Sequence, residues 1–133
     1  MAATVAYLDS SAFVKLVVRE PESSALTRSL ARWPERASAA LLRTEAVRAL
    51  RHSGNDGYVA RARSLMRSVH LVQVEEVLLD RAADLAPTTL RSLDAVHLAS
   101  AMSLGPDLGT VFAYDLRLVQ AAEALGLQVA SPA

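Results

Sequence analysis

The stretch Tyr7-Leu8-Asp9-Ser10-Ser11-Ala12 decides how the rest of this sequence is arranged. It continues an apolar run that begins at Val5 and ends abruptly in Asp9, and after two serines an apolar helical pattern begins. This order predicts a buried strand over residues 5–8, with Asp9 at its carboxyl end, directly before a helix over residues 12–18. In open α/β sheets, ligand sites lie outside the carboxyl ends of the strands.

Further short apolar segments alternate with helical patterns along the chain. Strands are predicted at residues 36–40, 70–74, 110–114 and 127–130. Helices are predicted at residues 22–33, 41–53, 58–68, from 75 to before Pro87, from 92 to before Gly105, and at 116–125. Strands that alternate with helices form βαβ units, so we expect the α/β class with a mostly parallel central sheet of four to five strands. The length of 133 residues, without a repeat or an internal linker, predicts one domain over residues 1–133.

The composition excludes several classes of function. Equal numbers of basic and acidic residues, 14 of each, weaken general nucleic-acid binding but leave room for a local basic rim. Cysteine is absent, so disulfides, a thiol nucleophile and a zinc–thiolate site are impossible, and we expect a cytoplasmic location. No segment has the features of a signal peptide or a membrane span, so no membrane association is expected.

Four acidic residues occupy positions where an acid is costly. Asp9 and Asp115 are predicted to end two strands, while Glu45 and Asp94 lie next to apolar helical faces. Because strand ends of a doubly wound sheet can flank one crevice, these side chains are expected to converge. Four neighbouring carboxylates do not all stay ionised without a cation, and ligands that are all oxygen favour Mg²⁺ or Mn²⁺ over zinc. Such a site can orient a phosphodiester and activate a water molecule.

Each acid also has a structural explanation when it is taken alone. The two strand-end aspartates can cap the helices that follow them. Asp94 suits the positive end of its helix, and Glu45 can pair with Arg43 or Arg48. The metal hypothesis therefore depends on the four acids as a set.

Four blocks of sequence surround these acids and cover almost the whole chain. They are Leu8-Asp9-Ser10-Ser11-Ala12-Phe13-Val14-Lys15-Leu16, Leu41-Leu42-x-x-Glu45, Ser92-Leu93-Asp94-Ala95-Val96-His97-Leu98-Ala99 and Ala113-Tyr114-Asp115-x-x-Leu118-x-x-Ala121-Ala122-x-x-x-Gly126-Leu127. Together they resemble the PIN-domain family, in particular the VapC-type toxin ribonucleases of bacterial toxin–antitoxin pairs. The blocks around Asp9 and Asp94 are the most specific.

The resemblance implies a three-layer α/β/α sandwich and endonucleolytic cleavage of RNA at an acidic Mg²⁺ or Mn²⁺ centre. It implies that Asp9, Glu45, Asp94 and Asp115 are both the catalytic acids and the metal ligands. It further implies a homodimer that is neutralised by a cognate antitoxin protein, whose C-terminal segment covers the active groove.

One position departs from the family pattern. Such proteins often carry a threonine or serine two residues before the last acid, and this position is Ala113 here. A hydroxyl that can orient a metal-bound water is therefore missing, and we expect Ser10 or Ser11 to supply it.

Basic residues near the acids are candidates for supporting roles. Arg91 and Arg117 each lie close to an acid in the sequence and are expected to contact RNA phosphates. His97 follows Asp94 by three residues. It is interpreted as a packed or hydrogen-bonded structural histidine, with a proton shuttle as the alternative.

Two other functions stay open from the sequence. In the first, Asp9 is the nucleophile of a phosphatase or phosphotransfer domain. Against it, the second aspartate of dehalogenase-type phosphatases corresponds to Ser11, and the only lysine is Lys15. In the second, the acids belong to a non-catalytic module that binds metal or RNA.

Overall fold

The computed structural model describes residues 3–133, and within them five strands form one parallel sheet. The strands are β1 (Val5–Leu8), β2 (Glu35–Ala39), β3 (His70–Val72), β4 (Leu108–Phe112) and β5 (Val129–Ala130). Their spatial order is β3-β2-β1-β4-β5, and each neighbouring pair runs parallel. The chain builds the sheet outward from β1 on one side and then on the other, so the order reverses between β1 and β4. The predicted mostly parallel sheet of four to five strands is confirmed.

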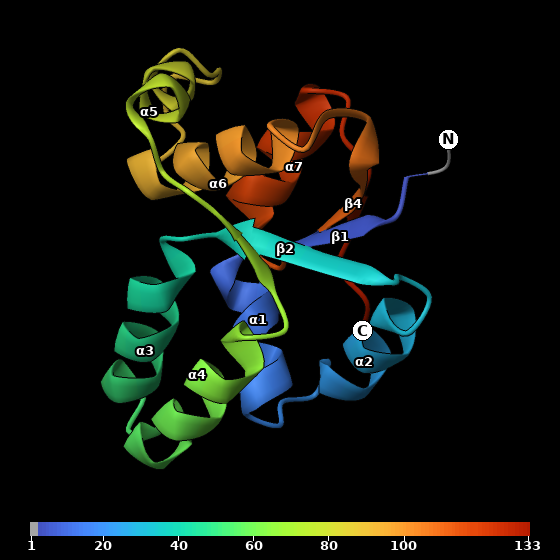
Figure 1. The fold of residues 1–133 in the computed structure, drawn as a ribbon, viewed down its shortest axis with the longest axis vertical. Helices are drawn as coiled ribbons and strands as arrows, with labels where there is room; N and C mark the ends of the chain where they lie inside the picture. Colours follow the sequence, from blue (N-terminus) through green and yellow to red (C-terminus); the bar gives the residue numbers. More distant parts are fainter. Residues whose placement is uncertain (1–2) are drawn as a thin grey trace.

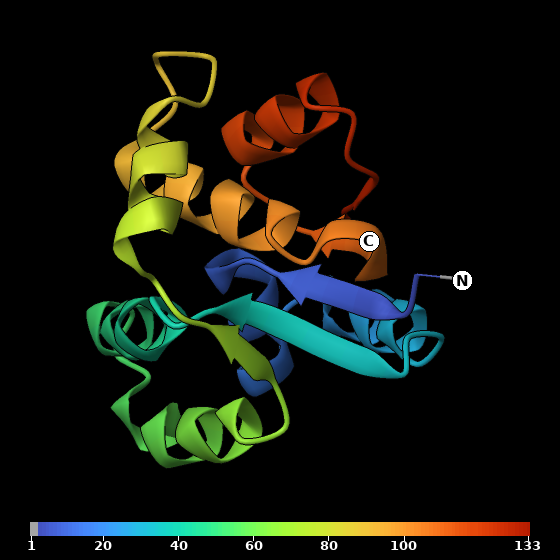
Figure 2. The ribbon, with the colours of Figure 1, turned by 45° about the horizontal axis from the view of Figure 1, so that its top comes forward.

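Helices cover both faces of the sheet and complete the predicted three-layer sandwich (Figure 1). One layer holds α1 (Ser10–Val17), α2 (Ser23–Leu30), α3 (Leu42–His52) and α4 (Val59–Met66). The other holds α5 (Glu76–Ala83), α6 (Ser92–Met102) and α7 (Leu116–Ala124), and Figure 2 shows the sheet between the two layers. Two short 3-10 helices, η1 (Asp56–Tyr58) and η2 (Gly105–Asp107), lie in connections. No helix within residues 3–133 is long and apolar enough to cross a lipid bilayer.

The strand β1 divides its side chains between two cores. All four of its residues are buried, and successive side chains point to opposite faces of the sheet. Ala6 and Leu8 pack into the core beneath α1–α4. Val5 and Tyr7 pack into the core beneath α6 and α7, beside Leu98. Apolar residues in succession are therefore required here, because a parallel sheet covered on both sides has no solvated face.

Helix α6 is buried along most of its length. Every residue from Ala95 to Ala101 is buried, and four of these seven are alanine or serine. Small side chains let the helix backbone approach its neighbours closely, and α6 packs against β2, β4, α5 and α7. The start of α6, where Asp94 lies, is therefore held firmly against the sheet.

The predicted helix over residues 22–33 is too long, because the chain turns after Leu30 and Trp33 packs against the sheet. The helix α2 ends at Leu30, and the amide of Trp33 donates to the Leu30 carbonyl in a closing turn. The Trp33 ring then lies on Gly109 of β4. A Cβ at that glycine would come within 2.0 Å of the ring, so only glycine leaves room for the indole.

The predicted last strand over residues 127–130 is also too long. Gly126 adopts a φ of 81°, and the amide of Leu127 donates to the carbonyl of Ala122. These are the features of a helix terminus closed by a left-handed glycine. Leu127 therefore belongs to the end of α7, and only Val129 and Ala130 pair with β4.

Candidate active site

The sheet places two of the four acids beside the point where its strand order reverses. Asp9 follows β1 directly, and Asp115 follows the neighbouring strand β4 after Ala113 and Tyr114. The chain leaves β1 toward the α1 layer and leaves β4 toward the α7 layer, which is the geometry of ligand sites in open α/β sheets. The prediction that Asp115 directly ends a strand is wrong, because β4 stops at Phe112.

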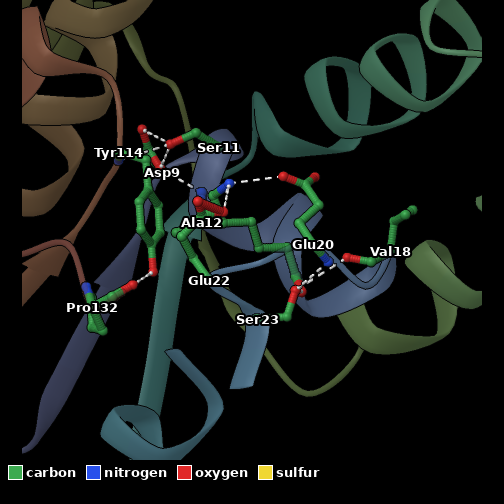
Figure 3. A network of polar contacts seen from close by, with 10 residues as sticks. Asp9, Ser11, Ala12, Val18, Glu20, Glu22, Ser23, Tyr114 and Pro132 are labelled. Carbon is green, nitrogen blue, oxygen red and sulfur yellow. Dashed lines mark hydrogen bonds and ion pairs between the residues drawn. The ribbon is translucent and has the colours of Figure 1, made fainter. Parts of the chain in front are cut away.

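Asp9 is buried, with 4% of its surface exposed, and it is held by its own helix. Its Oδ1 accepts a hydrogen bond from the amide of Ala12 at 2.8 Å, which caps α1. The Ser11 hydroxyl lies 2.7 and 2.9 Å from its two oxygens, and Figure 3 shows this contact. Burial raises the pKa of Asp9, the bonds from Ala12 and Ser11 oppose this, and the charge of Asp94 raises it again. A cation nearby would favour the ionised form.

Glu45 of α3 is bound by two groups from other elements. Its Oε1 accepts from the Ser10 hydroxyl at 2.5 Å and from Nε2 of His97 at 2.6 Å. Burial raises the pKa of Glu45, but these two hydrogen bonds outweigh that effect, so the net shift is downward. The partners of Glu45 are thus Ser10 and His97 instead of the arginines of its own helix, Arg43 and Arg48.

Arg91 joins the other two acids. Its Nε lies 3.3 Å from Oδ2 of Asp94, and its Nη2 lies 3.0 Å from Oδ2 of Asp115. The second oxygen of Asp115 accepts from the backbone amides of Arg117 and Leu118, which caps α7. Burial raises the pKa of Asp94, the Arg91 charge lowers it, and the charge of Asp115 raises it again. Arg91 thus contacts Asp94 and Asp115 through its side chain, and Arg117 contacts Asp115 through its backbone amide.

The charges of some of these acids shift the pKa of others, although the four side chains do not close around one point. The charge of Asp94 raises the pKa of Asp9, and the charge of Asp115 raises the pKa of Asp94. Among residues 3–133, however, no group of three or more His, Cys, Asp or Glu side chains is placed to hold a metal ion. The donors are all carboxylate oxygens, so they fit Mg²⁺ or Mn²⁺ by chemistry. Arg91, whose side chain is 61% exposed, pairs with both Asp94 and Asp115.

Hydrogen bonds of Tyr114 hold the segment that precedes Asp115 in place (Figure 3). The Tyr114 amide donates to the Ser11 hydroxyl at 3.1 Å, and the Tyr114 hydroxyl donates to the carbonyl of Pro132 at 2.6 Å. The ammonium of Lys15 lies 4.7 Å from the centre of the Tyr114 ring and pairs with two glutamates, Glu20 and Glu22. Because Ser11 also binds Asp9, this network ties the ends of β1 and β4 together.

Both candidate hydroxyls lie against acids. Ser10 contacts Glu45 and Ser11 contacts Asp9, as described above. Ala113, in contrast, is fully buried in the core under α6 and α7, and its carbonyl accepts from Ser131. The hydroxyls near the acids therefore come from the start of α1.

The sequence did not point to Tyr7 or Tyr114 as part of this site. Tyr7 lies in a buried aliphatic strand, and its hydroxyl shares a 2.7 Å hydrogen bond with Nδ1 of His97. A tyrosine in such a strand is itself a signal, because a buried phenol needs a polar partner. That partner comes from α6, 90 residues away, so no local pattern could identify it.

Comparisons with known proteins agree with this architecture. The profile of the PIN domain matches residues 6–124. Ribonuclease VapC46 of Mycobacterium tuberculosis is 49% identical over 126 residues, covering 95% of this chain and 96% of that protein. Ribonuclease VapC47 of the same organism is 35% identical over 130 residues, with the same coverage.

A solved structure has the same fold. Mycobacterium tuberculosis VapC20, described as a Sarcin-Ricin loop cleaving toxin, superposes with a TM-score of 0.77. The match covers 96% of this chain and 99% of that one, at 16% identity, so it supports the fold alone. Together with the two relatives and the PIN match over most of the sequence, it leads to one conclusion. The chain belongs to the PIN-domain family, and its relatives are ribonucleases of the VapC group.

Proposed function

We propose that this chain is a metal-dependent endoribonuclease that acts as the toxin of a type II toxin–antitoxin pair. The observation that carries the proposal is the PIN-domain match over residues 6–124, supported by the electrostatic coupling of Asp94 to Asp9 and to Asp115. The names of relatives that match nearly the whole chain support the ribonuclease activity.

Mg²⁺ or Mn²⁺ is the metal that suits these residues. We assign its binding to the carboxylates of Asp9, Asp94 and Asp115, together with Glu45. When bound, such an ion polarises a phosphoryl oxygen and lowers the pKa of a water molecule. The repulsion between Asp94 and Asp115, and between Asp9 and Asp94, supports a cation among them.

The side chains of the protein supply orientation and proton transfer. Ala12 and Ser11 fix the carboxylate of Asp9, so its remaining lone pairs keep one direction. Glu45, whose side chain is 20% exposed, is the group that we assign to accept the proton of the attacking water. The water oxygen bonds to phosphorus while the bond to the leaving ribose oxygen breaks, and that oxygen takes up a proton from solvent water. Arg91, when it leaves its two acids, is free to bind a phosphate of the RNA.

Replacement of Asp9 tests the proposed activity. Asp9→Asn keeps the size of the side chain and removes its charge, so RNA cleavage with Mg²⁺ or Mn²⁺ should fall by at least about 100-fold. The matched control is Asp80→Asn, because Asp80 is an exposed residue of α5. Cleavage of an end-labelled RNA is followed on a gel for both variants. Equal rates for Asp9→Asn and the wild type would rule out the proposed site.

The partners that we propose are an RNA substrate, a cognate antitoxin that covers the groove, and a second copy of the chain. Two exposed apolar side chains, Leu93 and Leu116, flank Asp94 and Asp115, and an apolar antitoxin segment could cover them. Expression of the wild-type chain alone should arrest growth, and co-expression with its cognate antitoxin should restore it. Growth that is unaffected by the active wild-type enzyme would contradict the toxin role.

A further inference from the structure

A buried polar pair lies behind Glu45, on the side of the sheet core. Tyr7 of β1 is fully buried, and His97 of α6 is 2% exposed. The Tyr7 hydroxyl lies 2.7 Å from Nδ1 of His97, and the two rings meet edge to face with centroids 5.9 Å apart. The pair is therefore fixed by packing as well as by hydrogen bonding.

The other nitrogen of His97 is directed at the acid. Nε2 lies 2.6 Å from Oε1 of Glu45, and since a carboxylate can only accept, Nε2 carries the hydrogen. The Ser10 hydroxyl donates to the same oxygen. Both bonds end on Oε1 and neither uses Oε2, so they hold the carboxylate while its second oxygen keeps its lone pairs for other ligands.

His97 cannot act on RNA directly. Its side chain is almost completely buried, and both of its ring nitrogens are engaged. Any influence of His97 on the reaction therefore passes through Glu45, which is 20% exposed, or through Ser10, whose hydroxyl lies 3.3 Å from Nε2 and itself donates to Glu45. This geometry excludes the proton shuttle as a direct role and leaves orientation of the acid.

We propose that His97, backed by Tyr7, is a positioning residue that fixes the carboxylate of Glu45 in its working orientation. The proposal rests on the proposed nuclease function. In this proposal, Tyr7 of β1 holds His97 of α6, and His97 in turn orients the carboxylate of Glu45 of α3. Loss of the donor should lower kcat and weaken metal binding, and it should leave the KM for RNA unchanged because His97 does not touch RNA.

Two substitutions of His97 separate the donor from the packing. His97→Gln places an amide nitrogen near the position of Nε2, where it can donate to Glu45, whereas His97→Asn is too short and reaches only toward Tyr7. We expect His97→Asn to lower kcat by about tenfold or more, which is the size of one hydrogen bond to a charged group. We expect His97→Gln to recover most of this loss. The Mn²⁺ dissociation constant, measured without RNA by calorimetry, should follow the same order.

The dependence on Glu45 is tested by a double-mutant cycle. In a Glu45→Gln background, His97→Asn should change kcat and the Mn²⁺ dissociation constant by less than about twofold, because the carboxylate that His97 positions is already replaced. Tyr7→Phe keeps the ring in the core and is the second variant, for the case in which His97→Asn does not fold. It should give a smaller loss of kcat that also disappears in the Glu45→Gln background.

The outcomes separate the positioning role from the function itself. If His97→Asn matches the wild type, raises the KM for RNA, or has the same effect with and without Glu45, then His97 is not a positioning residue. If Glu45→Gln cleaves RNA as fast as the wild type, or the wild type cleaves no RNA with either metal, the proposed function fails. If the wild type cleaves no RNA, the Mn²⁺ dissociation constants of the His97 variants still test whether His97 positions Glu45.

Discussion

Ser11 is the residue at which the two halves of the site meet. Its hydroxyl donates to Asp9 after β1 and accepts from the amide of Tyr114 after β4. One side chain therefore uses both its donor and its acceptor to hold two acid-bearing segments in register. The hydroxyl of the neighbouring Ser10 donates a hydrogen bond to Glu45 of α3. The two serines that follow Asp9 thus orient two different acids.

Removal of the Ser11 hydroxyl should destabilise the protein. Ser11→Ala leaves the buried carboxylate of Asp9 with one donor fewer and the Tyr114 amide without its acceptor, at a cost of about 1–3 kcal/mol. The free energy of unfolding is measured by urea denaturation. Ser24→Ala, at an exposed position of α2, is the control and should change stability by less than about 0.5 kcal/mol. A Ser11→Ala protein as stable as this control would show that the hydroxyl does not hold the two segments.

The ion pair of Lys15 should make stability depend on pH. The hydrogen bond from Lys15 lowers the pKa of Glu22 below its ordinary value of 4.5. A depressed pKa contributes stability above the ordinary value, and this contribution is lost as the pH falls through the folded-state pKa. The free energy of unfolding, measured from about pH 6 to about pH 3, should therefore fall less for Glu22→Gln than for the wild type. Identical slopes would contradict the pairing.

At the scale of the element, β4 depends on the contact between Trp33 and Gly109. The indole closes the end of α2 onto the sheet, and its ring occupies the space of a missing Cβ. The same strand leads to Tyr114 and Asp115 at its other end. The same strand therefore carries the Trp33–Gly109 contact at its beginning and leads to the candidate acid Asp115 after its end.

Addition of a methyl group at this contact should be costly. Gly109→Ala places a Cβ 2.0 Å from the Trp33 ring, and we expect a loss of about 1–3 kcal/mol from overpacking. Gly57→Ala is the control, because nothing lies within 4 Å of its added Cβ. The melting temperatures of both variants are compared by circular dichroism. Part of the loss should be recovered in Gly109→Ala with Trp33→Leu, and equal melting temperatures for the two single variants would contradict the close packing.

At the scale of the whole molecule, the sequence predicts the parallel sheet because local periodicity and strand–helix alternation determine it, and the resemblance to the PIN-domain family implies the three layers. The position of Asp9 could be predicted for the same reason, since an acid follows a buried strand and precedes a helix. The partners of Glu45 could not be predicted. His97 lies 52 residues further along the chain, and only the packing of α6 against the sheet brings it to α3. The end of β4 could not be predicted either. The amide of Ala113 still donates to Ala130 of β5, but its carbonyl accepts from the Ser131 side chain, and Tyr114 bonds to Ser11 and Pro132.

The central claim is that acids from four separate segments form one divalent-metal nuclease site. The most direct test is RNA cleavage by the purified wild-type chain after removal of metal with EDTA and after addition of Mg²⁺ or Mn²⁺, beside Asp94→Asn prepared in the same way. We predict no cleavage with EDTA, full recovery with the ion for the wild type, and no recovery for Asp94→Asn. Cleavage by the wild type that persists in EDTA, or recovery of Asp94→Asn to the wild-type rate, would contradict the claim.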